Sequence, residues 1–271
     1  MTELFRDFEH AGWSDDAVCA SYHDHFSSLT TQSIGALLDA ARVSAGSRVL
    51  DVATGAGYAA GAALERGAEV VGADFSAAQV RLARQRYPAA TFHERDAGNL
   101  PFERGAFDAV VSNYGVLHFP DPEAFFREAF RVLRSDGRLA FTVWDVPQEA
   151  KLFGAVLGAI ERHGSFDVGL PTGPNMFLFS EPTACERALT GAGFKGCAIT
   201  KVPQTWRPAS GDQILDFVTT GTVRTRGALA RQRSGAVSAI NDAILTALAP
   251  FRTAAGYEVP MPAILASATK P

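Results

Sequence analysis

Short apolar runs alternate with amphipathic segments over residues 33–144. An apolar run of about four to eight residues between turn residues is typical of a buried strand, whereas apolar positions three and four residues apart favour a helix. The best-marked helix start is Asp121-Pro122, an N-cap followed by proline at the first helical position. The pattern predicts strands at 48–53, 68–75, 90–97, 107–113 and 138–144, and helices at 33–41, 58–66, 77–87 and 122–133.

After residue 144 the pattern is looser. It favours helices at 151–164 and 181–194 and over most of 212–249, with strands at 196–206 and 259–270. Alternating strands and helices predict an α/β fold: a doubly wound, mostly parallel, seven-stranded Rossmann-like sheet with helices on both faces and a helical lid after the fifth strand. We expect one domain over 1–271, divided into an N-terminal helical cap at 1–44, a binding core at 45–145, a lid and acceptor region with a late strand at 146–258, and a closing strand at 259–271.

Composition narrows the class of protein. The chain is 47% hydrophobic and 20% charged, with a net charge of −4 and no basic block, so a nucleic-acid partner is not expected. Its first residues lack the basic and apolar regions of a secretory signal, and no apolar run is long enough to cross a bilayer, which predicts a cytoplasmic protein. Three widely spaced cysteines predict neither a disulfide framework nor a metal site.

The stretch VLDVATGAGY, Val49–Tyr58, is an apolar strand that ends in glycines. A P-loop is excluded because its GK[ST] ending is missing. Gly55 to Ala60 does fit G-x-G-x-x-[G/A], the dinucleotide fingerprint, and Asp74 lies seventeen residues after Gly57, where an acid accepts hydrogen bonds from ribose hydroxyls. A tight strand-to-helix turn without a ligand gives the same pattern.

Three further polar positions favour a ligand. Asp51 precedes the glycines, where a carboxylate suits a cationic group better than a pyrophosphate. Asp96 closes the third strand, and Asn113-Tyr114 ends the fourth. Because parallel strands end at one edge of the sheet, these side chains are predicted to line one crevice.

At this point the chain resembles a known family. The segments VLDVATGAGY, GADFS, RDAGNLPF, FDAVVSNYGVLHFPDP and FREAFRVLRSDGRLAFTVW are similar to the ordered motifs of class I S-adenosylmethionine-dependent methyltransferases, in the branch of the ubiquinone and menaquinone biosynthesis C-methyltransferases. The resemblance covers residues 20–145. It departs at Thr54, where that family usually has cysteine or serine.

The resemblance implies S-adenosylmethionine as cofactor and a role for each matching residue. Asp51 lies near the ammonium group, while Gly55 and Gly57 let the backbone approach the methionine part. Asp74 accepts hydrogen bonds from the ribose hydroxyls, and Asp96 accepts one from the adenine amine. Ala97 donates its backbone N–H to the adenine ring, and Asn113 lies beside the sulfonium. Neighbouring positions expected to contact the cofactor are Ala53, Phe75 and Gln79. Plain alternatives are a turn-capping role for Asp51 and an Asx-turn at Asp96.

Methyl transfer to a small-molecule acceptor, through a carbon, oxygen or nitrogen atom, needs mainly alignment. His118, in the apolar stretch GVLHFP, is the candidate general base; a structural histidine is the alternative. Tyr22 on the N-terminal segment and Tyr114 after the fourth strand are the other catalytic candidates. The acceptor is expected to be apolar or aromatic, and Trp206 and Arg224 are candidates to line its pocket.

Two other functions remain open. An NAD-dependent short-chain oxidoreductase needs a Tyr-x-x-x-Lys pair, and none of the four lysines lies four residues after a tyrosine. A non-catalytic protein that binds S-adenosylmethionine keeps the same motifs, since a fold does not fix a function.

Overall fold

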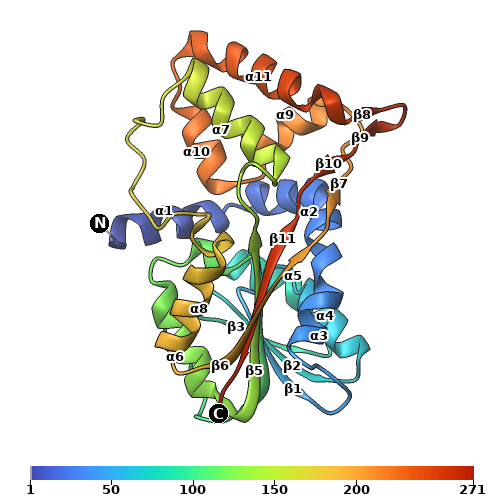
Figure 1. The fold of residues 1–271 in the computed structure, drawn as a ribbon, viewed down its shortest axis with the longest axis vertical. Coiled ribbons are helices and arrows are strands. Elements are labelled where there is room, and N and C mark those ends of the chain that lie inside the picture. Colours follow the sequence, from blue (N-terminus) through green and yellow to red (C-terminus); the bar gives the residue numbers. More distant parts are fainter. Residues whose placement is uncertain (1) are drawn as a thin grey trace.

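The computed structural model describes residues 2–271, which form one seven-stranded sheet in the order β3-β2-β1-β4-β5-β11-β6 (Figure 1). The first five strands are parallel, and β11 runs antiparallel between β5 and β6. This confirms the predicted doubly wound α/β fold. The strands are β1 (Arg48–Val52), β2 (Glu69–Asp74), β3 (Thr91–Glu94), β4 (Phe107–Asn113), β5 (Leu133–Trp144), β6 (Lys195–Val202) and β11 (Ala263–Thr269).

Helices cover both faces of the sheet because successive side chains of each strand point to opposite faces. In β1, Val49 packs with one layer while Leu50 and Val52 pack with the other. The first layer holds α3 (Ile34–Ala40), α4 (Tyr58–Glu65) and α5 (Ala77–Arg86). The second holds α6 (Pro122–Val132) and α8 (Pro182–Gly191). Asp121 caps α6 as predicted, accepting from the Ala124 N–H at 3.0 Å.

A further group of helices lies beyond the carboxyl ends of the parallel strands (Figure 1). It contains α7 (Lys151–His163), α9 (Gly211–Thr220), α10 (Val223–Ala230) and α11 (Ser234–Leu248). The N-terminal helices α1 (Thr2–Trp13) and α2 (Asp16–Thr30) lie between this group and the sheet (Figure 1). Phe26 of α2 stacks on Phe217 of α9 with ring centroids 4.1 Å apart. That these helices act as a lid, and that the chain divides at residues 44, 145 and 258, stay predictions.

The structure differs from the predicted elements at the start of β5 and at the two late strands. The strand predicted at 259–270 is divided into β10 (Val259–Pro260) and β11. β5 begins at Leu133 rather than at residue 138, and Asp136, with φ +63°, bends the chain inside it. The predicted strand at 196–206 is divided into β6 and the two-residue β7 (Thr205–Trp206), which pairs with β10 (Val259–Pro260) instead of the main sheet. The remaining short strands, β8 (Arg252–Thr253) and β9 (Gly256–Tyr257), form a hairpin. Among the described residues, no helix combines the length and the apolar content that crossing a membrane requires.

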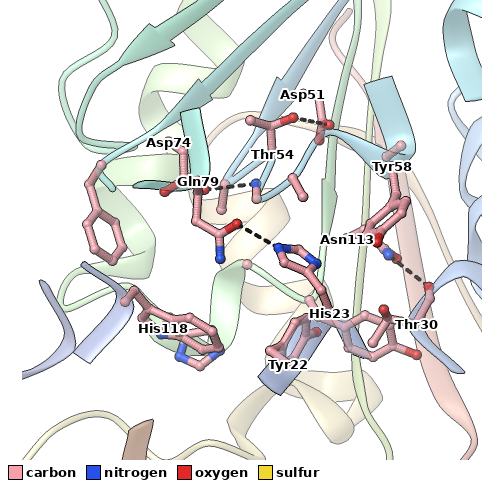
Figure 2. A pocket seen from close by; sticks show the side chains of 18 of the residues that line it. Tyr22, His23, Thr30, Asp51, Thr54, Tyr58, Asp74, Gln79, Asn113 and His118 are labelled. Atoms are coloured by element: carbon pink, nitrogen blue, oxygen red, sulfur yellow. Dashed lines mark hydrogen bonds between the residues drawn. The ribbon is translucent and has the colours of Figure 1, made fainter. Parts of the chain in front are cut away.

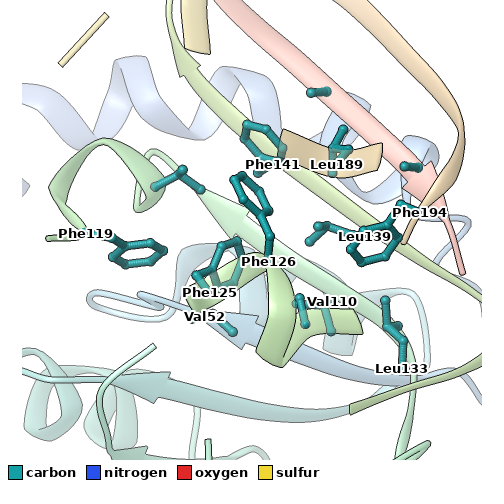
Figure 3. Close-up of a cluster of buried hydrophobic side chains, with 14 of the residues drawn as sticks. Val52, Val110, Phe119, Phe125, Phe126, Leu133, Leu139, Phe141, Leu189 and Phe194 are labelled. Atoms are coloured by element: carbon teal, nitrogen blue, oxygen red, sulfur yellow. The ribbon is translucent and has the colours of Figure 1, made fainter. Parts of the chain in front are cut away.

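Phe126 lies at the centre of the apolar cluster between the sheet and α6 (Figure 3). The side chain is fully buried, and its ring centroid lies 5.3 Å from those of Phe125 and Phe141 and 5.5 Å from that of Phe179. These rings come from α6, β5 and the segment before α8, so one side chain joins three parts of the fold.

We expect Phe126→Ala to lower the free energy of unfolding by about 3–5 kcal/mol, because it leaves a cavity that the neighbouring rings cannot fill. Urea denaturation measures this change. Leu4→Ala, at a side chain that is 66% exposed, is the control and should change stability by less than about 0.5 kcal/mol. Similar midpoints for both variants would show that the cluster does not hold the sheet to α6.

Candidate active site

The carboxyl ends of the parallel strands open onto two adjoining cavities. The first, here called the inner chamber, has a volume of about 100 Å³ and lies under α2 (Figure 2). The second, the outer chamber, has a volume of about 920 Å³ and extends along the end of β3. Drug-sized ligands occupy pockets of roughly 300–1,000 Å³, so one ligand spanning both chambers fits better than the inner chamber alone. Both chambers are lined by Ala53, Asp74, Phe75, His118 and Phe119.

The structure brings the predicted site residues to these two chambers. The inner chamber is lined by Tyr22, Asp51, Ala53, Gly55, Asp74, Phe75, Gln79, Asn113, Tyr114 and His118. Asp96 and Ala97 line the outer chamber. Of the predicted residues, Gly57 lines neither; it begins α4 with φ +84°, and a Cβ there would come within 2.9 Å of the Tyr87 ring. Gly57 therefore serves the tight turn and its packing.

Asp51, at the end of β1, is a buried carboxylate with one free oxygen. The residue is 1% exposed, and its Oδ2 accepts from the Thr54 hydroxyl at 2.6 Å and from the Ala60 N–H at 3.1 Å. Its Oδ1 has no hydrogen-bond partner among the described residues. Burial raises the pKa of Asp51 to about 7, against the hydrogen bonds from Thr54 and Ala60. The free oxygen is an acceptor suited to a cationic donor.

Asp74 ends the neighbouring strand β2 and holds the turn after β1 (Figure 2). Its two carboxylate oxygens accept from the N–H groups of Gly55 and Ser76, each at 2.9 Å. Burial raises the pKa of Asp74, although backbone hydrogen bonds from Ser76, Gly55 and Phe75 oppose the shift. A carboxylate has about four acceptor positions, so Asp74 can still accept a hydrogen bond from a further donor.

Two non-glycine residues at the strand ends adopt left-handed backbone conformations. Ala53 after β1 has φ +55° and Tyr114 after β4 has φ +58°. Gly55, with φ +56°, has open space where a Cβ would stand apart from Gln79 Oε1 at 3.9 Å. Such conformations cost about 1–3 kcal/mol each and cluster at functional sites. They turn the chain sharply at the two strand ends that border the inner chamber.

The amides of Asn113 and Gln79 are engaged with the N-terminal helices. Asn113 Nδ2 donates to Thr30 O at 2.9 Å, and its Oδ1 accepts from the hydroxyls of Ser33 and Thr142. Gln79 Oε1 lies 3.2 Å from His23 Nε2 on α2 (Figure 2). These side chains therefore dock α2 and the turn after it onto the sheet.

Asp96 lies two residues beyond the end of β3. Its Oδ1 accepts from the Gly98 N–H at 2.7 Å, which is the predicted Asx-turn. The residue is exposed, and the other carboxylate oxygen stays accessible from the outer chamber. The turn and a ligand-binding role are compatible, since they use different oxygens.

The three catalytic candidates differ in their freedom to act. Tyr114 is buried against Trp144, with ring centroids 4.0 Å apart, and its hydroxyl is hydrogen-bonded to Gln204. Burial raises the pKa of Tyr22 to about 12, which disfavours a tyrosinate. His118 is 22% exposed, lines both chambers and bonds Glu9 Oε2 through Nδ1 at 2.8 Å. Trp206 is fully buried core, so it lines neither chamber.

Sequence reasoning missed Glu9 and the hydroxyl of Thr54. The signal for Thr54 is its spacing of three residues from Asp51 at a strand end. Glu9 stands at helical spacing between Phe5 and Trp13, an acid on the apolar face of α1, which is the signal for a paired buried charge.

Known proteins are similar to this chain in sequence and in fold. The family model described as a methyltransferase domain matches residues 50–141. A demethylmenaquinone methyltransferase of Thermus thermophilus is 37% identical over 173 residues, which cover 58% of this chain and 78% of that protein. One of Beutenbergia cavernae is 37% identical over 123 residues, 45% of this chain and 51% of that protein.

A solved structure supports the fold. Phosphoethanolamine N-methyltransferase 2 of Haemonchus contortus, in complex with phosphomonomethylethanolamine and S-adenosylhomocysteine, has a TM-score of 0.62 at 20% identity, covering 98% of this chain and 60% of that one. The family excludes the alternative of an NAD-dependent oxidoreductase. The chain belongs to the class I S-adenosylmethionine-dependent methyltransferases and is an enzyme of that family.

Proposed function

We propose that this methyltransferase acts on a small, flat, apolar acceptor, an aromatic ring of the quinol kind, and that His118 receives the acceptor's proton. The observation that carries the proposal is the wall of the inner chamber. Six aromatic rings line it, and none of its lining residues within 2–271 is arginine or lysine. The rings belong to Trp13, Tyr22, Tyr58, Phe75, Tyr114 and Phe119.

Such a wall favours an aromatic acceptor over an anionic one. Aromatic rings pack on one another in edge-to-face and offset arrangements, as Trp13 and Tyr22 do here at 5.4 Å and 87°. A phosphate-bearing acceptor would need cationic donors to replace its water. The relatives named for demethylmenaquinone, a quinone, agree with the aromatic class.

The residues also fit the cofactor. S-adenosylmethionine supplies an activated methyl group on a sulfonium. Asp51 Oδ1, buried and without a partner among the described residues, is the acceptor for the ammonium group. Asp74 accepts from the ribose hydroxyls with its remaining lone pairs. Asp96 and the Ala97 N–H face the adenine in the outer chamber.

The other residues that were predicted to contact the cofactor have the following proposed roles. Gly55, Ala53 and Phe75 offer backbone and apolar surface to the cofactor. Asn113 and Gln79 also act through the helix that they dock, because Asn113 Nδ2 is bonded to Thr30 and Gln79 Oε1 to His23. Tyr22 and Tyr114 contribute aromatic faces near the sulfonium, where a cation is stabilised by the ring. A cytoplasmic location stays a prediction.

Asp51 makes cofactor affinity depend on pH. Its pKa near 7 in the free protein means that the carboxyl is increasingly protonated below neutrality, and an ammonium partner must then displace that proton. Linkage predicts that S-adenosylhomocysteine binds about tenfold more weakly at about pH 6 than at about pH 8. Calorimetric titration at both pH values measures this.

The control is Asp51→Asn, which keeps the shape and loses the charge. This variant should bind more weakly at about pH 8 and show little pH dependence, because no carboxyl remains to titrate. If wild type and Asp51→Asn show the same pH dependence, another group such as Asp74 carries it and the assignment of Asp51 is wrong.

Naphthohydroquinone and phosphoethanolamine test the acceptor class. With labelled S-adenosylmethionine, wild type should transfer the label to naphthohydroquinone and leave phosphoethanolamine unlabelled. His118→Gln should lower the saturated rate by about 10²–10⁴-fold while S-adenosylhomocysteine affinity changes little. Labelling of phosphoethanolamine alone would contradict the aromatic class, and an unchanged saturated rate in His118→Gln would end the general-base assignment.

A further inference from the structure

Glu9 is a carboxylate on the N-terminal helix that cofactor binding does not explain. It is 2% exposed although α1 is a surface helix. A buried carboxylate is costly unless it is paired, so its partners indicate what it is for.

Three elements meet at this carboxylate. Glu9 Oε2 lies 2.8 Å from His118 Nδ1, in the segment after β4, and accepts from Trp13 Nε1 at 3.1 Å. Its Oε1 accepts from Arg224 Nε of α10 at 2.7 Å. Arg224 also donates to the carbonyl of Leu117, the neighbour of His118, at 2.8 Å. The carboxylate therefore fixes both the ring of His118 and the backbone before it.

The contacts set the protonation state of both partners. Burial alone would raise the pKa of Glu9, but His118 and Arg224 outweigh it and lower that pKa, so the group is ionised. An ionised carboxylate only accepts hydrogen bonds, so the proton of the imidazole must be on Nδ1. In neutral His118 the lone pair is then on Nε2, which has no hydrogen-bond partner in the part of the chain that the structure describes.

We propose that Glu9 is a positioning residue: docking of α1 holds His118 in the Nδ1-protonated form, with Nε2 as the base for the methyl acceptor. The inference rests on the proposed function, in which His118 takes that proton. It adds that His118 can act as the base only when α1 is docked. Glu9, which fixes the tautomer of His118, lies on α1, and Arg224, which holds Glu9, lies on α10.

The step balances without another reactant. The acceptor's O–H proton moves to Nε2, and the electron pair that it leaves forms the new bond from the acceptor to the methyl carbon. The pair of the broken carbon–sulfur bond stays on sulfur. The imidazolium carries the proton's charge, and the Glu9 carboxylate at 2.8 Å compensates it.

Other charged groups also lie near His118. Arg224 of α10 lies on the far oxygen of Glu9, and Asp74 at the end of β2 interacts electrostatically with the His118 ring. Arg6, His10 and Asp121 line the same outer chamber. Glu9 is the carboxylate that is hydrogen-bonded to the ring, so its removal should change the tautomer of His118 most directly.

Nitrogen-15 NMR of histidine-labelled protein saturated with S-adenosylhomocysteine tests the proposal. The signal of His118 is identified by its loss in His118→Asn. Wild type should show the Nδ1-protonated form. In Glu9→Gln both tautomers of neutral His118 should be populated, because a glutamine amide can either accept a hydrogen bond from Nδ1 or donate one to it. The saturated rate with naphthohydroquinone should fall about tenfold or more.

Arg226→Gln is the matched control. It breaks another ion pair between the N-terminal helices and α10, Arg226 Nη1 to Asp15 Oδ2 at 3.2 Å, without a contact to His118. If Glu9 only docks α1, both variants lower the melting temperature and neither changes the tautomer of His118, which overturns the proposal. An Nε2-protonated His118 in wild type overturns it too, and this measurement needs no variant to fold. Wild type that does not turn over naphthohydroquinone contradicts the proposed acceptor, while the tautomer of His118 in wild type and in Glu9→Gln still decides the role of Glu9.

Discussion

Asp51 and Asp74 are carboxylates held out of water at the ends of two hydrogen-bonded strands, and their surroundings are arranged to give them partners. An unpaired buried charge costs several kcal/mol. The turn after β1 supplies the N–H groups of Gly55 and Ala60 and the hydroxyl of Thr54. These contacts leave one oxygen of Asp51 without a hydrogen-bond partner among the described residues, so that oxygen can still accept a hydrogen bond from a cationic donor.

The N-terminal helices α1 and α2 cover this site. Asn113 and Gln79, which stand on the sheet side, bond Thr30 and His23 of α2. Glu9 of α1 bonds His118 and Arg224. Residues of α1 and α2 thus line the inner chamber. The same few polar contacts hold these helices to the sheet side and hold the ring of His118.

Much of this was predictable from the sequence. Side chains on one face repeat every two residues in a strand and about every 3.6 residues in a helix, so both elements can be recognised in the sequence. The acids at strand ends can be located in the same way, from their positions along the chain. The core strands, the cap at Asp121 and the gathering of Asp51, Asp74 and Asn113 at one edge were therefore predicted and are confirmed. The resemblance to methyltransferases is confirmed by the relatives.

What the sequence did not show depends on contacts between distant residues. Glu9 meets partners 109 and 215 positions away, and no local pattern encodes such a distance. The engagement of the Asn113 amide by Thr30 is of the same kind, 83 positions apart. The left-handed backbone at Ala53 and Tyr114 was not expected either, because neither residue type favours it. Tertiary packing imposes these conformations.

The central claim is that this cavity binds S-adenosylmethionine through the acids at the strand ends. Calorimetric titration of S-adenosylhomocysteine into wild type and Asp74→Ala tests it most directly. Wild type should bind and the variant should bind at least about tenfold more weakly, since each hydrogen bond to a charged group contributes about 1.5–3 kcal/mol. NAD should give no binding. Equal affinity of wild type and Asp74→Ala for S-adenosylhomocysteine, or tight binding of NAD, would contradict the account.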